Sequence, residues 1–420
     1  MVEISSGSNH LFLPVPHSKT HFLDSFLPRL KHSLSLTLQH FYPLAGNLTW
    51  PPESEKPVIL YVNGDSVSLT IAESNNDFYH LSGNHTRSIT ESHPLVVPHL
   101  PVSDTVAPVL ALQVTAFPNC GFSIGFTMHK AVVDGKSSMM FMKSWASICK
   151  SGDSSLSPEL VPFYDRTVIK DPLGMEKVYL NNLLKPNNRS LMVMDPIAPS
   201  NTVKTTFGLS RADIERLRKR VLTRTTPSLH VSTSVLTCAY VWVCLVRADV
   251  KKKRIRLVFT VDCRARLDPP IPVTYFGNCF VGHMVRAETS EIKGEDGLAV
   301  AVEAFSKVIR GLDNGVLVGM KKDISVLSEE TDQATIGIAW SPQIGVYGVD
   351  FGWGRPAKAE MIISIDRTGA ISVVESRDGA GGVEVGLALK KQEMDVFASL
   401  FSNGLKALGI GFRFSNEICI

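Results

Sequence analysis

The chain has 420 residues, of which 44% are hydrophobic and 20% charged, and its formal net charge is +3. This length and composition allow a large buried core, most simply in two domains of ordinary size, and no long part of the chain needs to be disordered. The small net charge argues against a nucleic-acid partner. The longest apolar run, residues 235–246, is well short of the roughly 20 residues that cross a bilayer, so we expect no membrane partner.

The cysteine pattern and the first residues indicate a cellular compartment. Seven cysteines are scattered along the chain without two CxxC pairs, which is typical of reduced thiols. Residues 1–9 are mostly polar, and polar residues 17–20 interrupt any apolar leader. Together these features predict a cytoplasmic protein without a secretory signal.

The first half of the chain mixes helical and strand patterns. Within residues 20–41, five leucines recur three or four positions apart and predict a helix, which Pro28 should kink or restart. Asn63-Gly64-Asp65-Ser66 separates two runs of strand-forming residues. It predicts a hairpin between residues 58–62 and residues 67–71.

Two further strands are expected at residues 109–117 and 121–128, joined by a three-residue turn. The second strand alternates apolar with small polar residues, which is the period of a strand with one buried face, and it should be an inner strand of the first sheet. It leads into Lys130 and Asp134 and then into a helix over residues 136–147. A tight loop at this place can point one polar side chain into a cavity while the carboxylate braces the turn.

The second half is separated from the first by residues 152–201, which show little periodicity and indicate a crossover between domains. We expect an N-terminal domain over residues 1–160, a crossover over 161–202 and a C-terminal domain over 203–420. The start of the helix after residue 208, Ser210-Arg211-Ala212-Asp213, has the spacing of a capping box. Helices are also expected at residues 232–246, 298–309 and 393–408, and strands at 203–208, 255–261, 361–365, 371–375 and 383–389.

The mixture of strands and helices without strict alternation favours an α/β protein with mixed sheets and helices packed on them. There is no GxSxG elbow, because Gly121-Phe122-Ser123-Ile124-Gly125 lies inside an expected strand and not at a turn from a strand into a helix. No HExxH, Walker or GxGxxG pattern is present either, so the sequence offers no support for a serine hydrolase, a zinc protease or a nucleotide-binding fold. No histidine spacing supports a metal site.

Three segments carry the functional signal: the loop that ends in Asp134-Gly135, then Tyr275-Phe276-Gly277-Asn278-Cys279, and then Asp350-Phe351-Gly352-Trp353-Gly354. In their order and separation they resemble the BAHD family of plant acyl-CoA-dependent acyltransferases, and the resemblance covers nearly the whole chain. Among its branches, the sequence is most similar to the anthocyanin and phenolic glucoside malonyltransferases.

This resemblance implies two chloramphenicol-acetyltransferase-like domains with a central channel between them. It implies acyl-CoA, and malonyl-CoA in particular, as co-substrate, and the hydroxyl of a phenolic or flavonoid glycoside as the small-molecule acceptor. It also implies a monomer with no bound cofactor and no metal. In such enzymes the histidine of an HxxxD motif removes the proton of the acceptor, and the aspartate of the motif pairs with an arginine. By resemblance, Asp134 and Gly135 hold the loop, with Arg264 or Arg266 as the partner of Asp134.

The departure from the motif is at its first position, because Lys130 occupies the place four residues before Asp134 and His129 lies one residue earlier. A free lysine has a pKa of about 10.4 and is protonated at neutral pH. Three hypotheses follow. His129 could act as the base in a remodelled loop, Lys130 could act as a base of lowered pKa or as a cation that stabilises the oxyanion, or acyl transfer could be impaired while a ligand-binding channel remains.

The glycine-rich segment after residue 349 is expected to have a mainly structural role. Asp350 should brace the channel through an arginine, with proton transfer as the alternative. Gly352 and Gly354 should allow a tight turn, and Trp353 is expected in the core.

Ser232 and Thr233 open a helix whose N-terminus could bind a phosphate or the pantetheine arm of CoA, with ordinary capping as the alternative. Lys252 lies in a basic run that could reach CoA phosphates or form a solvated turn. The family's opening strand is expected to be missing or replaced by residues 1–9.

Overall fold

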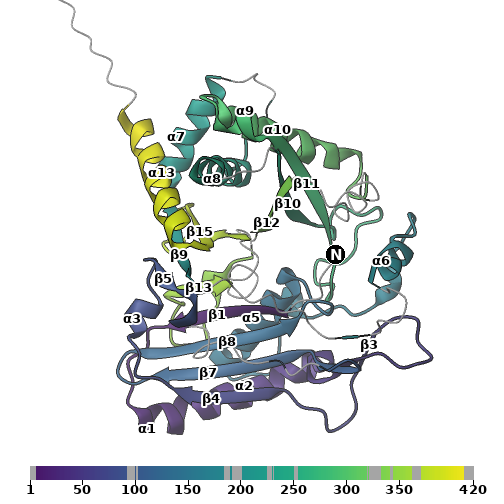
Figure 1. The fold of residues 1–420 in the computed structure, drawn as a ribbon. Helices are drawn as coiled ribbons and strands as arrows, with labels where there is room; N and C mark the ends of the chain where they lie inside the picture. Colours follow the sequence, from purple (N-terminus) through teal and green to yellow (C-terminus); the bar gives the residue numbers. More distant parts are fainter. Residues whose placement is uncertain are drawn as a thin grey trace, which may run out of the picture.

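The structure, a computed structural model, describes residues 6–91, 100, 103–183, 190–191, 201–224, 229, 231–249, 254–318, 320, 333–340, 344–361 and 370–410. Over these residues it contains a five-stranded sheet, a seven-stranded sheet and a small three-stranded sheet. Figure 1 shows the five-stranded sheet in the lower part of the molecule and the seven-stranded sheet with its helices above it. The predicted α/β class with mixed sheets is confirmed.

The first sheet has the order β13-β1-β8-β7-β4, and only the β4–β7 pair is parallel. Its strands are β1 (Ser6–Leu13), β4 (Ser68–Glu73), β7 (Leu110–Phe117), β8 (Gly121–His129) and β13 (Lys358–Met361). β8 is an inner strand, as predicted. Both of its faces are buried, however, because even the small polar residues Ser123 and Thr127 are almost inaccessible to solvent.

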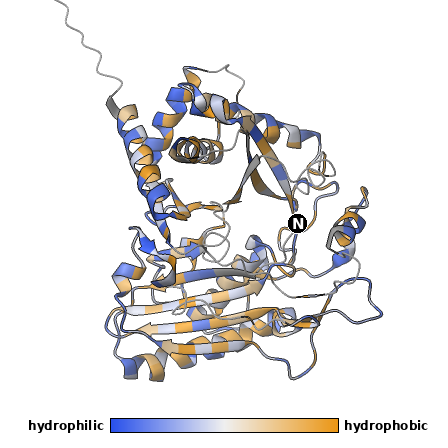
Figure 2. Ribbon diagram, viewed as in Figure 1, coloured by the Kyte–Doolittle hydropathy of each residue, from blue (hydrophilic) through white to orange (hydrophobic). Residues whose placement is uncertain are grey.

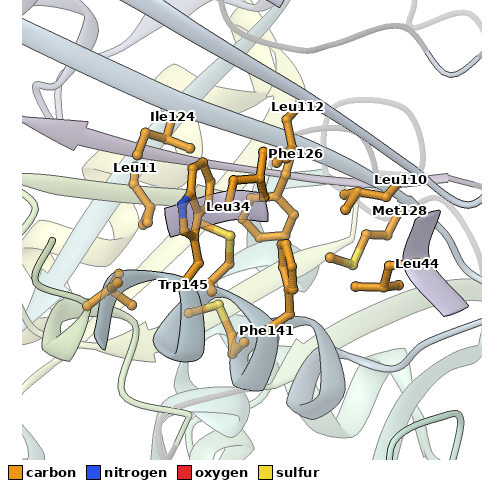
Figure 3. Close-up of a cluster of buried hydrophobic side chains, with 14 of the residues drawn as sticks. Leu11, Leu34, Leu44, Leu110, Leu112, Ile124, Phe126, Met128, Phe141 and Trp145 are labelled. Atoms are coloured by element: carbon orange, nitrogen blue, oxygen red, sulfur yellow. The ribbon is translucent and has the colours of Figure 1, made fainter. Parts of the chain in front are cut away.

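Two helices bury one face of this sheet, α2 (Leu27–His40) and α5 (Gly135–Ser151). Figure 3 shows Trp145 and Phe141 of α5 and Leu34 of α2 packed among side chains of β7 and β8. A π-helical stretch, Phe22–Phe26, precedes α2, and Pro28 lies in the first turn of α2. The helical backbone is continuous from Lys19 to His40, so the helix does not restart at Pro28, and a local π-helical stretch accommodates the proline instead.

The second sheet has the order β11-β10-β12-β14-β15-β9-β5. Its strands are β5 (Arg87–Ser88), β9 (Thr202–Leu209), β10 (Arg254–Asp262), β11 (Phe280–Glu288), β12 (Gln333–Trp340), β14 (Ile371–Glu375) and β15 (Val383–Lys390), and its main helices are α7 (Arg211–Leu222), α8 (Thr233–Asp249), α10 (Gly297–Gly311) and α13 (Lys391–Ile410). A second hydrophobic core joins α8 to these neighbours. Figure 2 shows apolar residues recurring along α8 and along the central strands of the first sheet.

The capping box predicted before α7 is confirmed, because Ser210 and Asp213 each accept a hydrogen bond from the other's backbone N–H. Residues 361–365 were predicted as a strand, and of these only Met361, at the end of β13, lies within the described residues. The sequence patterns did not indicate β11 or the short helix α6 (Met175–Leu183), which lies inside the predicted crossover.

Two strands cross the predicted division of the chain. β13, from the second half, forms an edge of the first sheet against β1, and β5, from the first half, forms an edge of the second sheet against β9. The boundaries at residues 160 and 203 remain a prediction. Each sheet nevertheless depends on a strand from the other half of the chain.

The predicted hairpin around Gly64 is wrong. The turn itself forms, with the Asp65 N–H donating to the Val62 carbonyl at 2.9 Å. The flanking strands then separate, since β3 (Val58–Leu60) pairs with β2 (Asn47–Thr49) in the small sheet, which is completed by β6 (Val106–Pro108), and β4 pairs with β7. Packing of β4 against the first core outweighs the local hairpin signal.

The expectation about the opening strand also needs correction. Residues 6–13 form β1, which pairs with β8 from Ser6 opposite His129 to Leu13 opposite Phe122. The apolar residues Leu11, Phe12 and Leu13 are buried, and they are the part of the segment that indicates a strand.

Within the described part of the chain, no helix combines the length and apolar character needed to span a membrane.

Candidate active site

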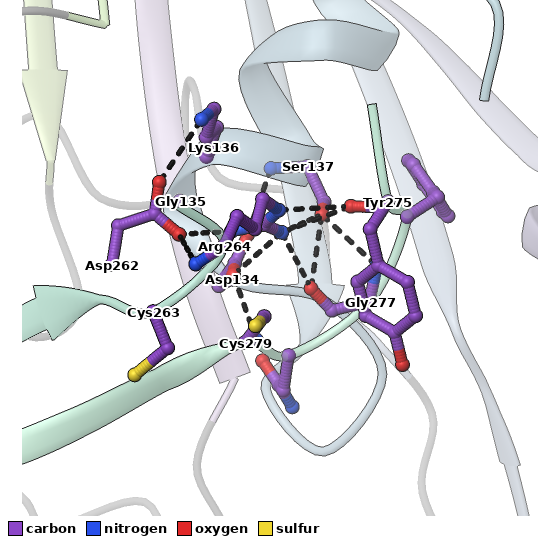
Figure 4. Close-up of polar contacts among 12 residues, drawn as sticks. Asp134, Gly135, Lys136, Ser137, Asp262, Cys263, Arg264, Tyr275, Gly277 and Cys279 are labelled. Atoms are coloured by element: carbon purple, nitrogen blue, oxygen red, sulfur yellow. Dashed lines mark hydrogen bonds and ion pairs between the residues drawn. The ribbon is translucent and has the colours of Figure 1, made fainter. Parts of the chain in front are cut away.

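The loop between β8 and α5 is fixed by Asp134, which is the N-cap residue of α5. Its Oδ1 accepts the Ser137 N–H at 2.8 Å, and its Oδ2 accepts the Cys279 N–H at 3.0 Å. The same Oδ2 lies 2.9 Å from a guanidinium nitrogen of Arg264. Asp134 therefore points into the protein and joins the start of α5 to the segment that follows β10 (Figure 4).

Arg264 is the centre of this network, and its side chain is only 1% exposed. Besides Asp134, it contacts Asp262 at 2.7 Å and donates to the carbonyls of Tyr275 and Gly277 at 3.0 Å. Burial alone would lower the pKa of the guanidinium, but Asp134 and Asp262 outweigh burial and raise it. Of the two arginines expected near Asp134, Arg264 makes the ion pair, whereas Arg266 is exposed.

The segment Tyr275–Cys279 is attached to the loop at three points. Ser137 Oγ donates to the Gly277 carbonyl and accepts from the Gly277 N–H, both at 3.0 Å. Asn278 Nδ2 donates to the Lys130 carbonyl at 2.8 Å, and Cys279 binds Asp134 as described. Sequence analysis did not single out Ser137 or Asn278. Their positions inside the two motifs were the available signal.

Gly277 suits its position chiefly because of its backbone conformation. Its φ is +152°, and a Cβ there would lie 2.5 Å from a guanidinium nitrogen of Arg166, which also binds the Phe276 carbonyl. A side chain at position 277 would therefore strain the backbone and push the end of the Arg166 side chain aside.

His129 is the last residue of β8 and its side chain is completely buried. Its Nδ1 accepts the Ala131 N–H at 3.2 Å, so the neutral ring carries its proton on Nε2. Burial lowers the pKa of His129, and an interaction with the Leu191 backbone partly offsets this effect. The ring is thus neutral but has no free basic nitrogen to offer a substrate, which argues against His129 as the base.

Lys130 follows His129 and is exposed. Its backbone carbonyl is held by Asn278, so the main chain at this position is tied to the same network as Asp134. The loop therefore has a fixed backbone with an exposed lysine side chain at the position that the family motif gives to histidine.

Asp350 lies at the other end of α5. Its Oδ2 accepts from Lys150 Nζ at 2.7 Å, and its Oδ1 accepts the N–H groups of Gly352 and Gly354 at 2.8 and 3.0 Å. Burial alone would raise the pKa of Asp350, but Lys150 and the two amides lower it. Among the described residues, the cation that binds Asp350 is Lys150 and not the expected arginine.

The 16 residues from Asp134 to Lys150 place Asp350 about 24 Å along α5 from the loop. A carboxylate at that distance cannot take a proton from a group beside Lys130. Trp353 packs against Phe26 with ring centres 4.7 Å apart, and the Arg29 guanidinium lies 5.0 Å from the Trp353 ring. Gly352 and Gly354 have φ of +98° and +106°, which suits a tight turn.

The expected CoA contacts are placed only in part. Ser232 Oγ accepts the Val235 N–H at 3.3 Å, which is the geometry of ordinary capping at the start of α8, and Thr233 is the first residue of that helix. Lys252 lies outside the described residues.

A pocket of about 580 Å³ opens beside Arg266. It is lined mostly by apolar side chains, with Lys170, Arg266 and Asp268 as its charged residues. This size and lining suit a small organic ligand. Among the described residues, no group of three or more His, Cys, Asp or Glu side chains could hold a metal ion.

Comparison with known proteins agrees with this architecture. Residues 13–403 match the model of the Transferase family. Phenolic glucoside malonyltransferase 2 of Arabidopsis thaliana is 43% identical over 92% of this chain and 88% of its own length. Malonyl-CoA:anthocyanidin 5-O-glucoside-6''-O-malonyltransferase of the same plant is 44% identical over 91% of this chain and 88% of its own length.

Solved structures are similar in fold. Vinorine synthase has a TM-score of 0.73 with 20% identity, over 95% of this chain and 92% of that protein. F. graminearum TRI101 complexed with coenzyme A and T-2 mycotoxin has a TM-score of 0.72 with 15% identity, over 94% and 93%. The two-domain fold expected from the sequence is therefore confirmed.

Proposed function

Because this chain belongs to the BAHD acyltransferase family, we propose that it transfers malonyl from malonyl-CoA to a hydroxyl of a phenolic or flavonoid glycoside. The observation that carries the proposal is the 43–44% identity to two malonyltransferases across nine-tenths of the chain. The network of Asp134, Arg264, Ser137 and Gly277 supports it, because it holds the loop in one conformation. We further propose that the protein acts as a monomer in the cytoplasm.

The reaction requires removal of a proton from the acceptor hydroxyl. The oxygen then attacks the thioester carbonyl, the C–S bond breaks, and CoA leaves as a thiol after taking up the proton. A protonated Lys130 cannot accept a proton, although it can donate a hydrogen bond to the oxyanion that forms on the carbonyl. We therefore propose slow turnover that depends on positioning of the two substrates.

Replacement of Lys130 by histidine tests this proposal. CoA release from malonyl-CoA with a phenolic glucoside should be slow for the natural chain and about 10²- to 10⁴-fold faster for Lys130→His, with KM little changed, because the variant gains a general base. Lys19→His, at an exposed position in the first helix, provides the matched control and should leave the rate unchanged. Equal rates for the natural chain and Lys130→His would show that Lys130 does not limit catalysis.

A second candidate function is ligand binding without turnover. The exposed Lys130 beside a buried His129 favours it, since neither side chain presents a basic nitrogen in the manner that the motif requires. Calorimetric titration with CoA separates the two candidates. Binding of CoA by both the natural chain and Lys130→His, with no CoA release from malonyl-CoA by either, would favour the second.

A further inference from the structure

The end of β10 has different neighbours on its two sides. Asp262 binds Lys136, at the start of α5, at 2.9 Å and Arg264 at 2.7 Å. Val261 and Cys263, the residues before and after Asp262, belong instead to a third hydrophobic core. Because neighbouring residues of an extended chain point in opposite directions, this core lies behind the strand as seen from α5. Figure 4 shows the Cys263 side chain pointing away from the Arg264 network.

The pocket of about 580 Å³ beside Arg266 lies on this third core. Its wall includes Val316 and Met320, which are members of the core. All of its lining residues lie within residues 168–173, 266–269 and 315–320. The pocket is therefore separate from the loop that carries Lys130.

Hydrogen bonds hold the three wall segments in place. His283 Nε2 of β11 donates to the Val316 carbonyl at 3.0 Å. The Asp171 carboxylate accepts two N–H groups from the start of α6, at 2.7 and 2.8 Å. The Ile271 N–H donates to the Arg264 carbonyl at 2.9 Å and closes the turn that contains residues 266–269. A ligand therefore meets a wall that is already ordered, which lowers the entropic cost of binding.

The wall of the pocket is mainly apolar, and part of it is open to solvent. Leu173 and Val318 are 36% and 59% exposed, and Leu267 and Val316 contribute further apolar surface. Water beside such a surface is poorly held, and an apolar ligand that displaces it gains affinity. A volume of about 580 Å³ lies in the range of pockets for small organic molecules and far exceeds that of one water molecule. The pocket therefore suits a ligand with a bulky apolar body.

Arg266 gives this apolar pocket a preference for negative charge. The wall carries two cations, Lys170 and Arg266, and one carboxylate, Asp268. Thr167 and, to a smaller extent, Lys170 lower the pKa of the Asp165 carboxyl, so Lys170 already has a carboxylate nearby. In the described part of the chain, the Arg266 guanidinium makes no ion pair or hydrogen bond. Charge-assisted hydrogen bonds are about twice as strong as neutral ones, so an anionic group beside Arg266 is favoured over a neutral one.

We propose that this pocket binds an amphipathic organic anion, with its apolar body on the third core and its carboxylate or sulfonate beside Arg266. An inorganic ion gains nothing from the apolar wall, and a neutral apolar molecule gains nothing from Arg266. The site is separate from the acyl transfer proposed above and does not depend on Lys130 or on turnover.

Fluorescence titration of the full chain with anilinonaphthalene sulfonate tests the proposal, because this probe joins an apolar ring system to one sulfonate. Phenylnaphthylamine has the same rings without the sulfonate and is the neutral control. One sulfonate probe should bind to each chain, about tenfold more tightly than the neutral probe. Equal affinities of the two probes, or sulfonate binding that does not saturate, would overturn the proposal.

Two variants at exposed positions of the wall test where the probe binds. Arg266→Gln removes the cation and should abolish the tenfold difference between the probes, whereas Arg220→Gln, at an exposed position of α7, should preserve it. Val318→Trp places a larger side chain on the wall and should abolish the binding of both probes. Unchanged binding in Arg266→Gln or in Val318→Trp, with the fold verified by circular dichroism, would place the probe elsewhere and overturn the proposal.

Displacement of the sulfonate probe from the natural chain separates this pocket from the binding site of CoA. Dodecanoate and anthracene carboxylate both join an apolar body to a carboxylate, the first as a chain and the second as rings. Displacement by either acid would support the proposal and show which body fits the wall. CoA should leave the probe in place. Displacement by CoA, or by neither acid, would overturn the proposal.

Discussion

At the scale of single residues, the chemistry available to the loop after β8 depends on whether His129 or its neighbour Lys130 faces solvent. His129 is the last residue of β8, both faces of which are buried, and the hydrogen bond from Ala131 fixes its tautomer. Lys130, one position later, is exposed. A change of register that exposed His129 would have to move the Lys130 carbonyl away from Asn278. The network around Asp134 therefore opposes such a change.

The buried His129 predicts a dependence of stability on pH. Its pKa in the folded protein is lowered from about 6.5, so the unfolded chain binds the proton more readily. The contribution of neutral His129 to the free energy of unfolding is fully present above about pH 6.5. This contribution is lost as the pH falls toward the lower pKa of His129 in the folded state. Tm should therefore fall less between pH 7.5 and pH 5.5 for His129→Gln than for the natural chain. An identical fall in both proteins would show that His129 does not contribute.

At the scale of elements, the start of α5 is stabilised by a buried ion pair. Removal of Arg264 would leave Asp134 buried without its cation, in addition to the loss of the hydrogen bonds to Tyr275 and Gly277. Breaking a buried pair by removing one partner costs about 3–5 kcal/mol. We expect Arg264→Met to lower the free energy of unfolding in urea by about that amount.

The matched control for Arg264→Met is Arg266→Met, two residues away at an exposed position. Exposed substitutions usually change the free energy of unfolding by less than about 0.5 kcal/mol. Similar losses for both variants would contradict the assignment of Arg264 as the residue that holds the loop.

The elements also show what sequence could and could not predict. Long periodic segments such as α8 and α10, and the capping box of Ser210, carry their signal locally and were predicted. The hairpin around Gly64 failed because strand partners are chosen by long-range packing. The choice of Arg264 over Arg266 and the burial of His129 depend on contacts between distant segments, which spacing along one chain does not contain.

At the scale of the whole molecule, the two exchanged strands couple the sheets. Glu360 of the first sheet binds Arg87 and Lys204 of the second, so neither sheet can separate without exposing or isolating these charges. The pairs are buried, in contrast to the exposed pair Lys19–Glu73, which lies within the first half of the chain. Buried and exposed ion pairs of similar chemistry should therefore differ greatly in their effect on stability.

Glu360→Ala tests this coupling. It removes the buried carboxylate that Arg87 and Lys204 share and should lower the free energy of unfolding by about 3 kcal/mol or more at pH 7. Glu73→Ala should lower it by less than about 1 kcal/mol, because that pair is screened by solvent. Urea unfolding followed by circular dichroism gives both values. If the two losses are equal, the sheets are held together by their apolar contacts, and the charged junction has no special part in joining the two halves of the chain.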